Sequence, residues 1–380
     1  MHTICVKYRL YPTHAQQTAL EQTLDICRQV YNSFLHWRKF AYETTGEAPG
    51  LRQQEKALTV WKAEHPELKS VHAHLLQNVA VRVDLAFQAF FRRAKQGQTP
   101  GYPREKGAGC YDSLTWKEYG NGCRLNTDSL TLSKIGTIKA VMHRYLPGTP
   151  KTCTVRRQGD KWYATFACLV EQEPLPESAE TVGLDVGLEK FAATSDGEFV
   201  ENPRFFKKDE KALKRAQRKV ERHKKGSRKR RKAKKMVRRI HERIANRRHD
   251  FCHQTARRLV NRYGLIAVEK LNIQGMVQNG HLAKSIQDAA WSMFRRVLSE
   301  KAASAGRQVV EVNPAYTSQD CSGCGYRAKK KLSERWHFCP MCGLSLDRDI
   351  NAAVNILQTA VGLHSVRKAE RSRADLSAAE

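Results

Sequence analysis

The chain has 380 residues, 41% of them hydrophobic, and a formal net charge of +29. This length and composition allow two or three domains with packed cores, and they exclude a disordered basic tail. No run of eighteen apolar residues occurs and no secretory segment follows Met1, so we expect a soluble, cytoplasmic protein without a membrane partner. The charge exceeds what solubility requires and predicts a polyanionic partner.

The first hundred residues predict one strand followed by helices. Residues 2–11 alternate in polarity and end before Pro12, and Thr13 is suited to cap the helix predicted over 14–45. Helical spacing continues in two further segments, residues 51–62 and about 71–94. The second of these carries an apolar stripe, which we interpret as the core of a helical bundle rather than as a ligand site, formed by Val71, Leu75, Val79, Val83, Phe87 and Phe90.

Short strands follow a loop rich in Gly and Pro. This loop, residues 98–109, contains Tyr102, Arg104 and Lys106, so it is either a nucleic-acid contact or a plain connector. The predicted strands cover 125–132, 137–143, 152–156 and 161–170. Together with the first strand they predict a small β-barrel, with a helical domain inserted between its first two strands. The predicted boundaries are 1–12 and 98–172 for the barrel, 13–97 for the helical domain, and 173–180 for an acidic linker.

The second half of the chain alternates strands with helices. The pattern predicts a three-stranded meander over residues 181–200 and a long helical region, then a strand at 265–271, a helix at 286–305 and a strand at 308–312. A last helix is predicted from Arg348 to about Val361. This order is that of an RNase H-like α/β domain, which we predict for residues 181–314 and 346–362.

In that fold, the first strand, the fourth strand and the start of the last helix converge at one edge of the sheet. Asp185, Glu269 and Asp349 would then meet, and we predict that they are catalytic acids. Crowded carboxylates need cations, and hard oxygen ligands favour magnesium or manganese, so we predict two such ions. The alternative for Asp185 is a buried salt bridge. Asp347 competes with Asp349 but is better placed as the N-cap, and Asn351 either assists the site or caps locally.

Four cysteines near the C-terminal end have the spacing of a metal ribbon. Two Cys-x-x-Cys pairs are separated by fourteen residues, which allows four thiolates to surround one structural zinc ion. The predicted zinc ligands, within a ribbon at residues 315–345, are Cys321, Cys324, Cys339 and Cys342. Four free cysteines or a redox pair are the alternative. The other seven cysteines show no pairing pattern, as is typical of a reducing compartment.

A strongly basic segment lies between the meander and the fourth strand. Residues 207–248 contain twenty-two Lys or Arg and four acidic residues, and apolar residues keep helical spacing on both sides of Gly226 and Ser227. A solvated helical face is the alternative, but this density of one charge predicts a helical hairpin that contacts phosphates. The predicted nucleic-acid contacts are Lys207, Lys208, Lys214, Arg215, Arg218, Lys219, Arg222, Lys224, Lys225, Arg228, Lys229, Arg230, Arg231, Lys232, Lys234, Lys235, Arg238 and Arg239.

Several stretches resemble the TnpB family of insertion-sequence proteins, compact RNA-guided DNA nucleases related to type V CRISPR effectors. The matching stretches are KYRLYPT at 7–13, RQVYNSFL at 28–35, VGLDVGLEKFA at 182–192, ENPRFF at 201–206, AVEKLNI at 267–273, YTSQDCSGCG at 316–325 and CPMCGLSLDRDINAAVNI at 339–356. Position by position, the resemblance implies that Asp185, Glu269 and Asp349 are the acids of a RuvC-like site and that the four ribbon cysteines bind zinc.

The resemblance also implies a guide RNA transcribed from the end of the element, a double-stranded DNA target and no small-molecule substrate. The expected function is therefore RNA-guided, metal-dependent DNA cleavage that supports a transposon, in the nucleoid of a bacterial or archaeal cell. Two hypotheses compete with it: a nucleic-acid-binding regulator of transposition that does not cut, and a transposase that joins strands with the same three acids. Residues 363–380 are polar and mixed in charge, and we expect them to be a disordered tail.

Overall fold

The computed structural model describes residues 2–171, 173–328 and 334–362. The chain divides into two compact units, residues 1–171 and 172–380, and each is described by itself. Within the described residues, no helix combines the length and the apolar composition needed to cross a bilayer. The tail expected at 363–380 lies outside the described residues.

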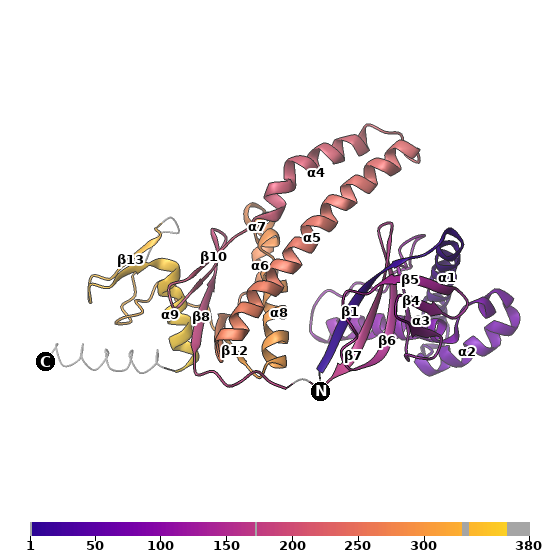
Figure 1. Cartoon of the computed structure of the whole chain (residues 1–380), viewed down its shortest axis with the longest axis horizontal. Coiled ribbons are helices and arrows are strands. Elements are labelled where there is room, and N and C mark those ends of the chain that lie inside the picture. The colour runs from indigo at the N-terminus through magenta and orange to yellow at the C-terminus, as the bar shows by residue number, and fades with distance from the viewer. Residues whose placement is uncertain (1, 172, 329–333, 363–380) are drawn as a thin grey trace. The chain divides into compact units, whose positions relative to one another are not determined.

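The first unit combines a seven-stranded antiparallel sheet with helices (Figure 1). Its helices lie between the first two strands, as predicted: β1 (His2–Tyr11), α1 (His14–Thr45), α2 (Leu51–Glu64), the 3-10 helix η1 (Pro66–Ser70) and α3 (Ala73–Lys95). The remaining strands are β2 (Ser113–Trp116), β3 (Cys123–Leu125), β4 (Ser129–Leu132), β5 (Gly136–Val141), β6 (Thr149–Gln158) and β7 (Lys161–Val170). The strand order is β2-β6-β7-β1-β5-β4-β3, so β2 and β3 are edges and the predicted barrel closure stays a prediction.

Local sequence explains most of this unit, with one correction. Thr13 caps α1, because its hydroxyl accepts from the amide of Gln16, whose side chain returns the bond to Thr13. The stripe on α3 is core, since Val79 and Val83 are fully buried. The prediction of a single strand over 125–132 was wrong. The turn-forming residues 126–128 interrupt it, and they separate β3 from β4.

The second unit contains a five-stranded sheet with helices on both faces. Its elements are β8 (Thr181–Val186), β9 (Lys190–Thr194), β10 (Phe199–Glu201), α4 (Phe205–Glu221), α5 (Arg228–Arg262), β11 (Leu265–Glu269), α6 (Ile273–Val277), α7 (Gly280–Ala289), α8 (Trp291–Ser304), β12 (Gln308–Val312), β13 (Trp336–Phe338), β14 (Ser345–Asp347) and α9 (Arg348–Ala360). The order is β10-β9-β8-β11-β12; β8, β11 and β12 run parallel, and β9 is antiparallel to both of its neighbours.

Alternate residues of the central strands face different helices. Val182 and Leu184 belong to the core with α5 and α8, whereas Ala267 packs with Ile356 of α9. Gly183 is the point where β8 and α9 meet most closely, since a Cβ atom there would lie 2.0 Å from the carbonyl oxygen of Ala353. Only glycine permits this approach, and it brings the backbone of α9 directly onto β8.

The predicted helix over 286–305 is in fact two helices. Ala290 adopts a left-handed conformation with φ of 59°, which ends α7 and starts α8. Gly and Pro are the residues that usually mark such a break, and neither occurs in this stretch. Burial of Trp291, Phe294 and Leu298 against the sheet orients α8, so packing rather than local propensity determines the break.

The basic segment folds as the predicted helical hairpin. Ser227 caps α5 by accepting from the amide of Arg230, and α4 packs along the first part of α5. A small core of its own, formed by Leu213, Ala216, Ile240 and Ile244, joins the two helices. Met236, one of the apolar residues at helical spacing after Ser227, is exposed and lies outside this core. Figure 1 shows the connection between the two helices projecting away from the sheet of this unit.

Candidate active site

Two of the predicted acids lie on adjacent parallel strands. Leu184 of β8 pairs with Val268 of β11, and Asp185 and Glu269 follow these residues directly. Because both strands run in the same direction, the two carboxylates reach the same edge of the sheet. Both side chains are partly buried.

The third acid is presented by the first turn of α9. Asp347 is the N-cap, as predicted, and its carboxylate accepts from the amides of Asp349 and Ile350 at 2.8 and 3.3 Å. Asp349 therefore remains available to the sheet edge, where the guanidinium of Arg335 lies 3.8 Å from its carboxylate. The structure thus gives Asp347 a role at the helix terminus, and the choice of Asp349 as the third site residue stays a prediction.

Electrostatics connect Asp185 to the other two acids. The pKa of Asp185 lies well above its usual range because of burial, then because of the nearby charges of Glu269 and Asp349. Burial also raises the pKa of Glu269, and burial together with Asp347 raises that of Asp349. Each shift means that the ionised form is disfavoured where it stands. A divalent cation bound between the carboxyl groups would favour their ionised forms. A set of donor atoms made only of oxygen suits magnesium or manganese.

The acids do not form a tight single-ion cage. Within the part of the chain that the structure describes, the four ribbon cysteines are the group of at least three possible ligands whose donor atoms all lie within 4.8 Å.

Thr317 contacts one of the acids, although the sequence reasoning did not single it out. Its hydroxyl donates to Glu269 Oε1 at 2.6 Å and lies 3.2 Å from the carbonyl oxygen of Pro314. The preceding residue, Tyr316, has a left-handed backbone with φ of 68°, which is uncommon for a bulky residue. In the sequence, Asn313-Pro314 at the end of β12 predicts a turn near Thr317, but it does not predict the contact of Thr317 with Glu269.

The four cysteines come together at one point of the ribbon. Sγ of Cys321 lies 3.6 Å from that of Cys342, and Sγ of Cys324 lies 3.5 Å from that of Cys339. A tetrahedral zinc site with Zn–S bonds of ~2.3 Å has edges of about 3.8 Å, so these separations fit the ion. Burial raises the pKa of the Cys339 thiol, but the backbone amides of Cys342 and Met341 outweigh this and lower it to about 7.

Two buried asparagines connect the ribbon to α9. Asn351 accepts from the amide of Ser322 and donates to the carbonyl of Asp320, both at 2.9 Å. Asn355 donates to the carbonyls of Thr317 and Asp320 at 2.8 and 2.7 Å. Asn351 is therefore neither an additional acid-site ligand nor a local cap. It fixes the residues on either side of Cys321 to the helix that carries Asp349.

The predicted nucleic-acid contacts lie along the hairpin of α4 and α5. Sixteen of these eighteen side chains are exposed, and Arg230 and Lys235 are partly buried. Arg230 has a structural partner, because its guanidinium donates to the carbonyls of Val220 and His223 at 2.7 and 2.8 Å and closes the turn. The remaining charge is displayed on a folded surface rather than on a flexible chain.

An acidic sheet edge, a four-cysteine ribbon and a basic hairpin are together typical of proteins that act on nucleic acids. Three family models match the chain: OrfB_IS605, "Probable transposase", at residues 165–280; "Cas12f1-like, TNB domain" at 291–356; and a "Helix-turn-helix domain" of the same OrfB group at 1–47. The described part of this range, residues 2–47, folds here as one strand and one long helix, so the third description does not fit its structure.

Relatives cover nearly the whole chain. A "Putative RNA-guided DNA endonuclease" of Streptomyces pristinaespiralis is 36% identical over 94% of this chain and 89% of its own length. The "Putative RNA-guided DNA endonuclease InsQ" of Escherichia coli is 31% identical over 92% of this chain and 90% of its own. The chain belongs to the TnpB family. Its fold is similar to that of a mini-RNA-guided endonuclease, CRISPR-Cas phi3, with a TM-score of 0.53 and 10% identity over 95% of this chain and 92% of that one.

Proposed function

We propose that this protein is an RNA-guided, divalent-metal-dependent DNA endonuclease of a transposable element, working in the cytoplasm of its host. The observation that carries the proposal is that Asp185 and Glu269 lie side by side on adjacent strands of the five-stranded sheet, with Asp349 close enough to raise the pKa of Asp185. A protein that only binds nucleic acid has no need to hold three carboxylates together against their mutual repulsion. The names of the two long relatives support the same activity.

In this proposal the three acids hold two magnesium or manganese ions. When bound, such ions supply an activated water and stabilise the departing 3′ oxygen of a phosphodiester. Asp185 and Glu269 contribute from rigid adjacent strands, and Asp349 contributes from a helix end that Asp347 caps. Thr317 keeps the carboxylate of Glu269 in one orientation. The chain thus fixes the ligands before metal or substrate arrives.

The ribbon has a structural task in the proposal. A zinc ion bound by the four cysteines holds residues 320–324 in place, and Asn351 and Asn355 transmit that order to α9. The position of Asp349 therefore depends on the ribbon, although no cysteine contacts the acidic site.

The partners in the proposal are a guide RNA and a target DNA. The exposed hairpin side chains would contact phosphates of one or both, since lysine and arginine bind phosphate without reading sequence. Base pairing between guide and target would then supply the specificity that the hairpin lacks.

Sequencing the RNA that co-purifies with the protein tests the proposal first. A DNA target complementary to that RNA should be cut in magnesium and left intact in EDTA, and Asp185→Ala should abolish cutting. A wild-type complex with its own RNA that never cuts such a target, across a library of flanking sequences, would favour the binding-only regulator. Religated products would favour the strand-joining transposase.

A further inference from the structure

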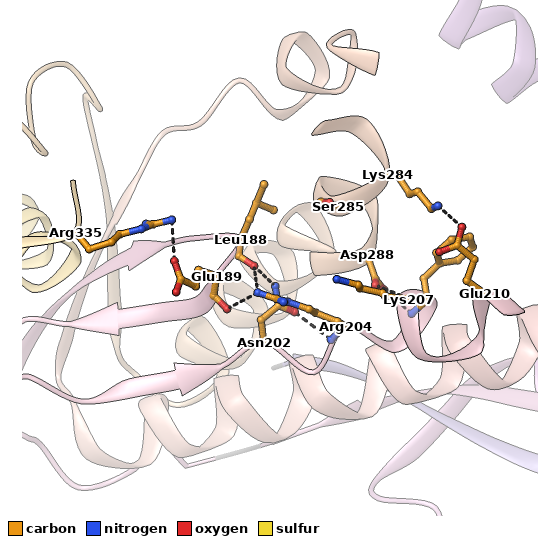
Figure 2. A pocket seen from close by; sticks show the side chains of 11 residues that line it. Leu188, Glu189, Asn202, Arg204, Lys207, Glu210, Lys284, Ser285, Asp288 and Arg335 are labelled. Carbon is orange, nitrogen blue, oxygen red and sulfur yellow. Dashed lines mark hydrogen bonds and ion pairs between the residues drawn. The ribbon is translucent and has the colours of Figure 1, made fainter. Parts of the chain in front are cut away.

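A pocket of about 560 Å³ adjoins the acidic site within the second unit. It is lined by the β8–β9 turn, the segment leading into α4, the helix α7 and Arg335 of the ribbon. Figure 2 shows polar and charged side chains along this pocket, with the Glu189–Arg335 pair at one end and the Glu210–Lys284 pair at the other. Its volume is that of a small-molecule site and is large enough for one nucleotide.

Arg335 connects the pocket to the proposed catalytic acids. Its guanidinium donates to Glu189 at 2.8 Å and lies 3.8 Å from the carboxylate of Asp349. A strand with one phosphodiester at the acids would therefore have its neighbouring nucleotide at this pocket.

Each acid that lines the pocket already has a cationic partner. Glu189 pairs with Arg335, and Glu210 pairs with Lys284 and Lys214. Asp288 pairs with Arg248 at 2.8 Å and also accepts from the backbone amides of Phe206 and Lys207 at the start of α4. No acid that lines the pocket is therefore left to neutralise the remaining lining cations.

The two remaining cations are Arg204 and Lys207. Arg204 contacts only neutral groups among the described residues, the carbonyls of Leu188 and Glu189 at 3.4 and 3.3 Å. Its backbone is left-handed with φ of 47°, an uncommon conformation for arginine, and it lies at the N-cap of α4. Lys207 is exposed, and no ion-pair partner of its ammonium group lies among the described residues. The pocket thus carries two positive charges available to an anion.

We propose that this pocket binds the sugar and phosphate of one nucleotide in a single DNA strand, next to the bond held at the acids. Arg204 and Lys207 bind the phosphate, and the hydroxyl of Ser285 offers a hydrogen bond to the sugar. This inference rests on the proposed nuclease function and adds a substrate subsite to it.

Lys207→Ala and Lys208→Ala form a matched pair for testing the subsite. Both remove one charge from exposed neighbouring positions of α4, and both were predicted to contact phosphates, so the loss of a general phosphate contact affects both variants. Only Lys207 lines the pocket. In EDTA, with the RNA-bound protein, a fluorescent six-nucleotide DNA strand should bind about tenfold more weakly to Lys207→Ala than to Lys208→Ala. Equal affinities of the two variants would overturn the subsite. Tighter binding of an RNA strand or of a short duplex would overturn the assignment of a single DNA strand.

Neutral linkages test the same contact during cutting. A methylphosphonate at the linkage next to the cut should slow the wild type, and it should slow Lys207→Ala no further, because the charged contact is already lost. Equal slowing of both proteins would overturn the subsite while leaving the nuclease function intact. If the strand bound in a manner that depends on Lys207 but the wild-type protein cut no target, the subsite would stand and the proposed nuclease function would fail.

Discussion

At the scale of single residues, Asp185 opposes folding of the metal-free protein. Burial and the neighbouring carboxylates raise its pKa well above the ordinary 3.8. A carboxyl group whose pKa is raised by folding does not change the free energy of unfolding at a pH below its ordinary pKa. As the pH rises above that value and through the folded-state pKa, the group lowers the free energy of unfolding. At neutral pH without metal, the carboxyl group of Asp185 therefore destabilises the native state.

Asp185→Asn should consequently raise the melting temperature in EDTA at neutral pH, by about 2–4 °C for each kcal/mol of strain removed. The advantage should shrink as the pH falls toward 3.8. Magnesium should stabilise the wild type more than the variant, because the variant lacks a ligand. Differential scanning fluorimetry with and without magnesium measures both effects. A variant that melts below the wild type in EDTA would contradict the argument.

Thr317 supports a second prediction at this scale. Thr317→Val keeps the shape of the side chain and removes the donor to Glu269. The magnesium concentration for half-maximal cutting should rise about 10- to 100-fold, as is typical when the partner of a metal ligand is lost. Thr317→Ser retains the hydroxyl and should restore the wild-type value, and manganese binding followed by electron paramagnetic resonance gives a reading independent of cutting. If the Val and Ser variants bound metal equally well, the hydroxyl of Thr317 would have no role in metal binding.

At the scale of elements, the ribbon and α9 behave as one unit through their asparagine contacts. Cys324→Ser should lose the single zinc ion, and it should also lose cutting, since the ribbon holds the helix that carries Asp349. Cys110→Ser removes an exposed thiol outside the cluster and should change neither property. Metal analysis and a cleavage assay on both variants decide this. A wild-type protein purified without zinc would contradict the coupling.

The hairpin permits a prediction about charge. Replacement of Arg228, Lys229, Arg231 and Lys232 by glutamate leaves Arg230 to close the turn. Binding should weaken to the same degree for unrelated nucleic-acid sequences, and each lost phosphate contact should flatten the slope of log affinity against log salt by roughly 0.7 to 0.9. Salt titrations on two sequences measure this. An unchanged slope would mean a solvated face, and an altered sequence preference would mean base reading.

At the scale of the whole molecule, the positive charge and the acidic site lie on different elements. Residues 207–248 carry a net +18 of the total +29, whereas the acids lie at the ends of β8 and β11 and the start of α9. Glu269→Gln should therefore abolish cutting while nucleic-acid affinity and its salt slope stay as in the wild type. Filter binding at several salt concentrations, beside a cleavage assay, checks this. A large loss of affinity would show that the acidic site also carries binding.

The sequence predicted what depends on local pattern. Strand β12 and helix α1 match their predicted bounds because polarity and caps mark them, and the cysteine spacing predicted the cluster. Contacts between distant segments were not predictable in this way. Thr317 reaches Glu269 across 48 positions, and Arg335 reaches Asp349 only because the ribbon folds back. The break at Ala290 likewise comes from burial of the following residues and not from a helix-breaking residue.

The close approach of β8 and α9 at Gly183 has a consequence for how relatives are sorted into cutting and non-cutting copies. A single methyl group there would meet the carbonyl of Ala353 and force the helix outward, together with the carboxylate that it presents to Asp185. Every acid and every cysteine would still be present in such a copy. Decay of a transposon gene can therefore begin at a residue with no side chain, and inspection of the acids alone would count that copy as active.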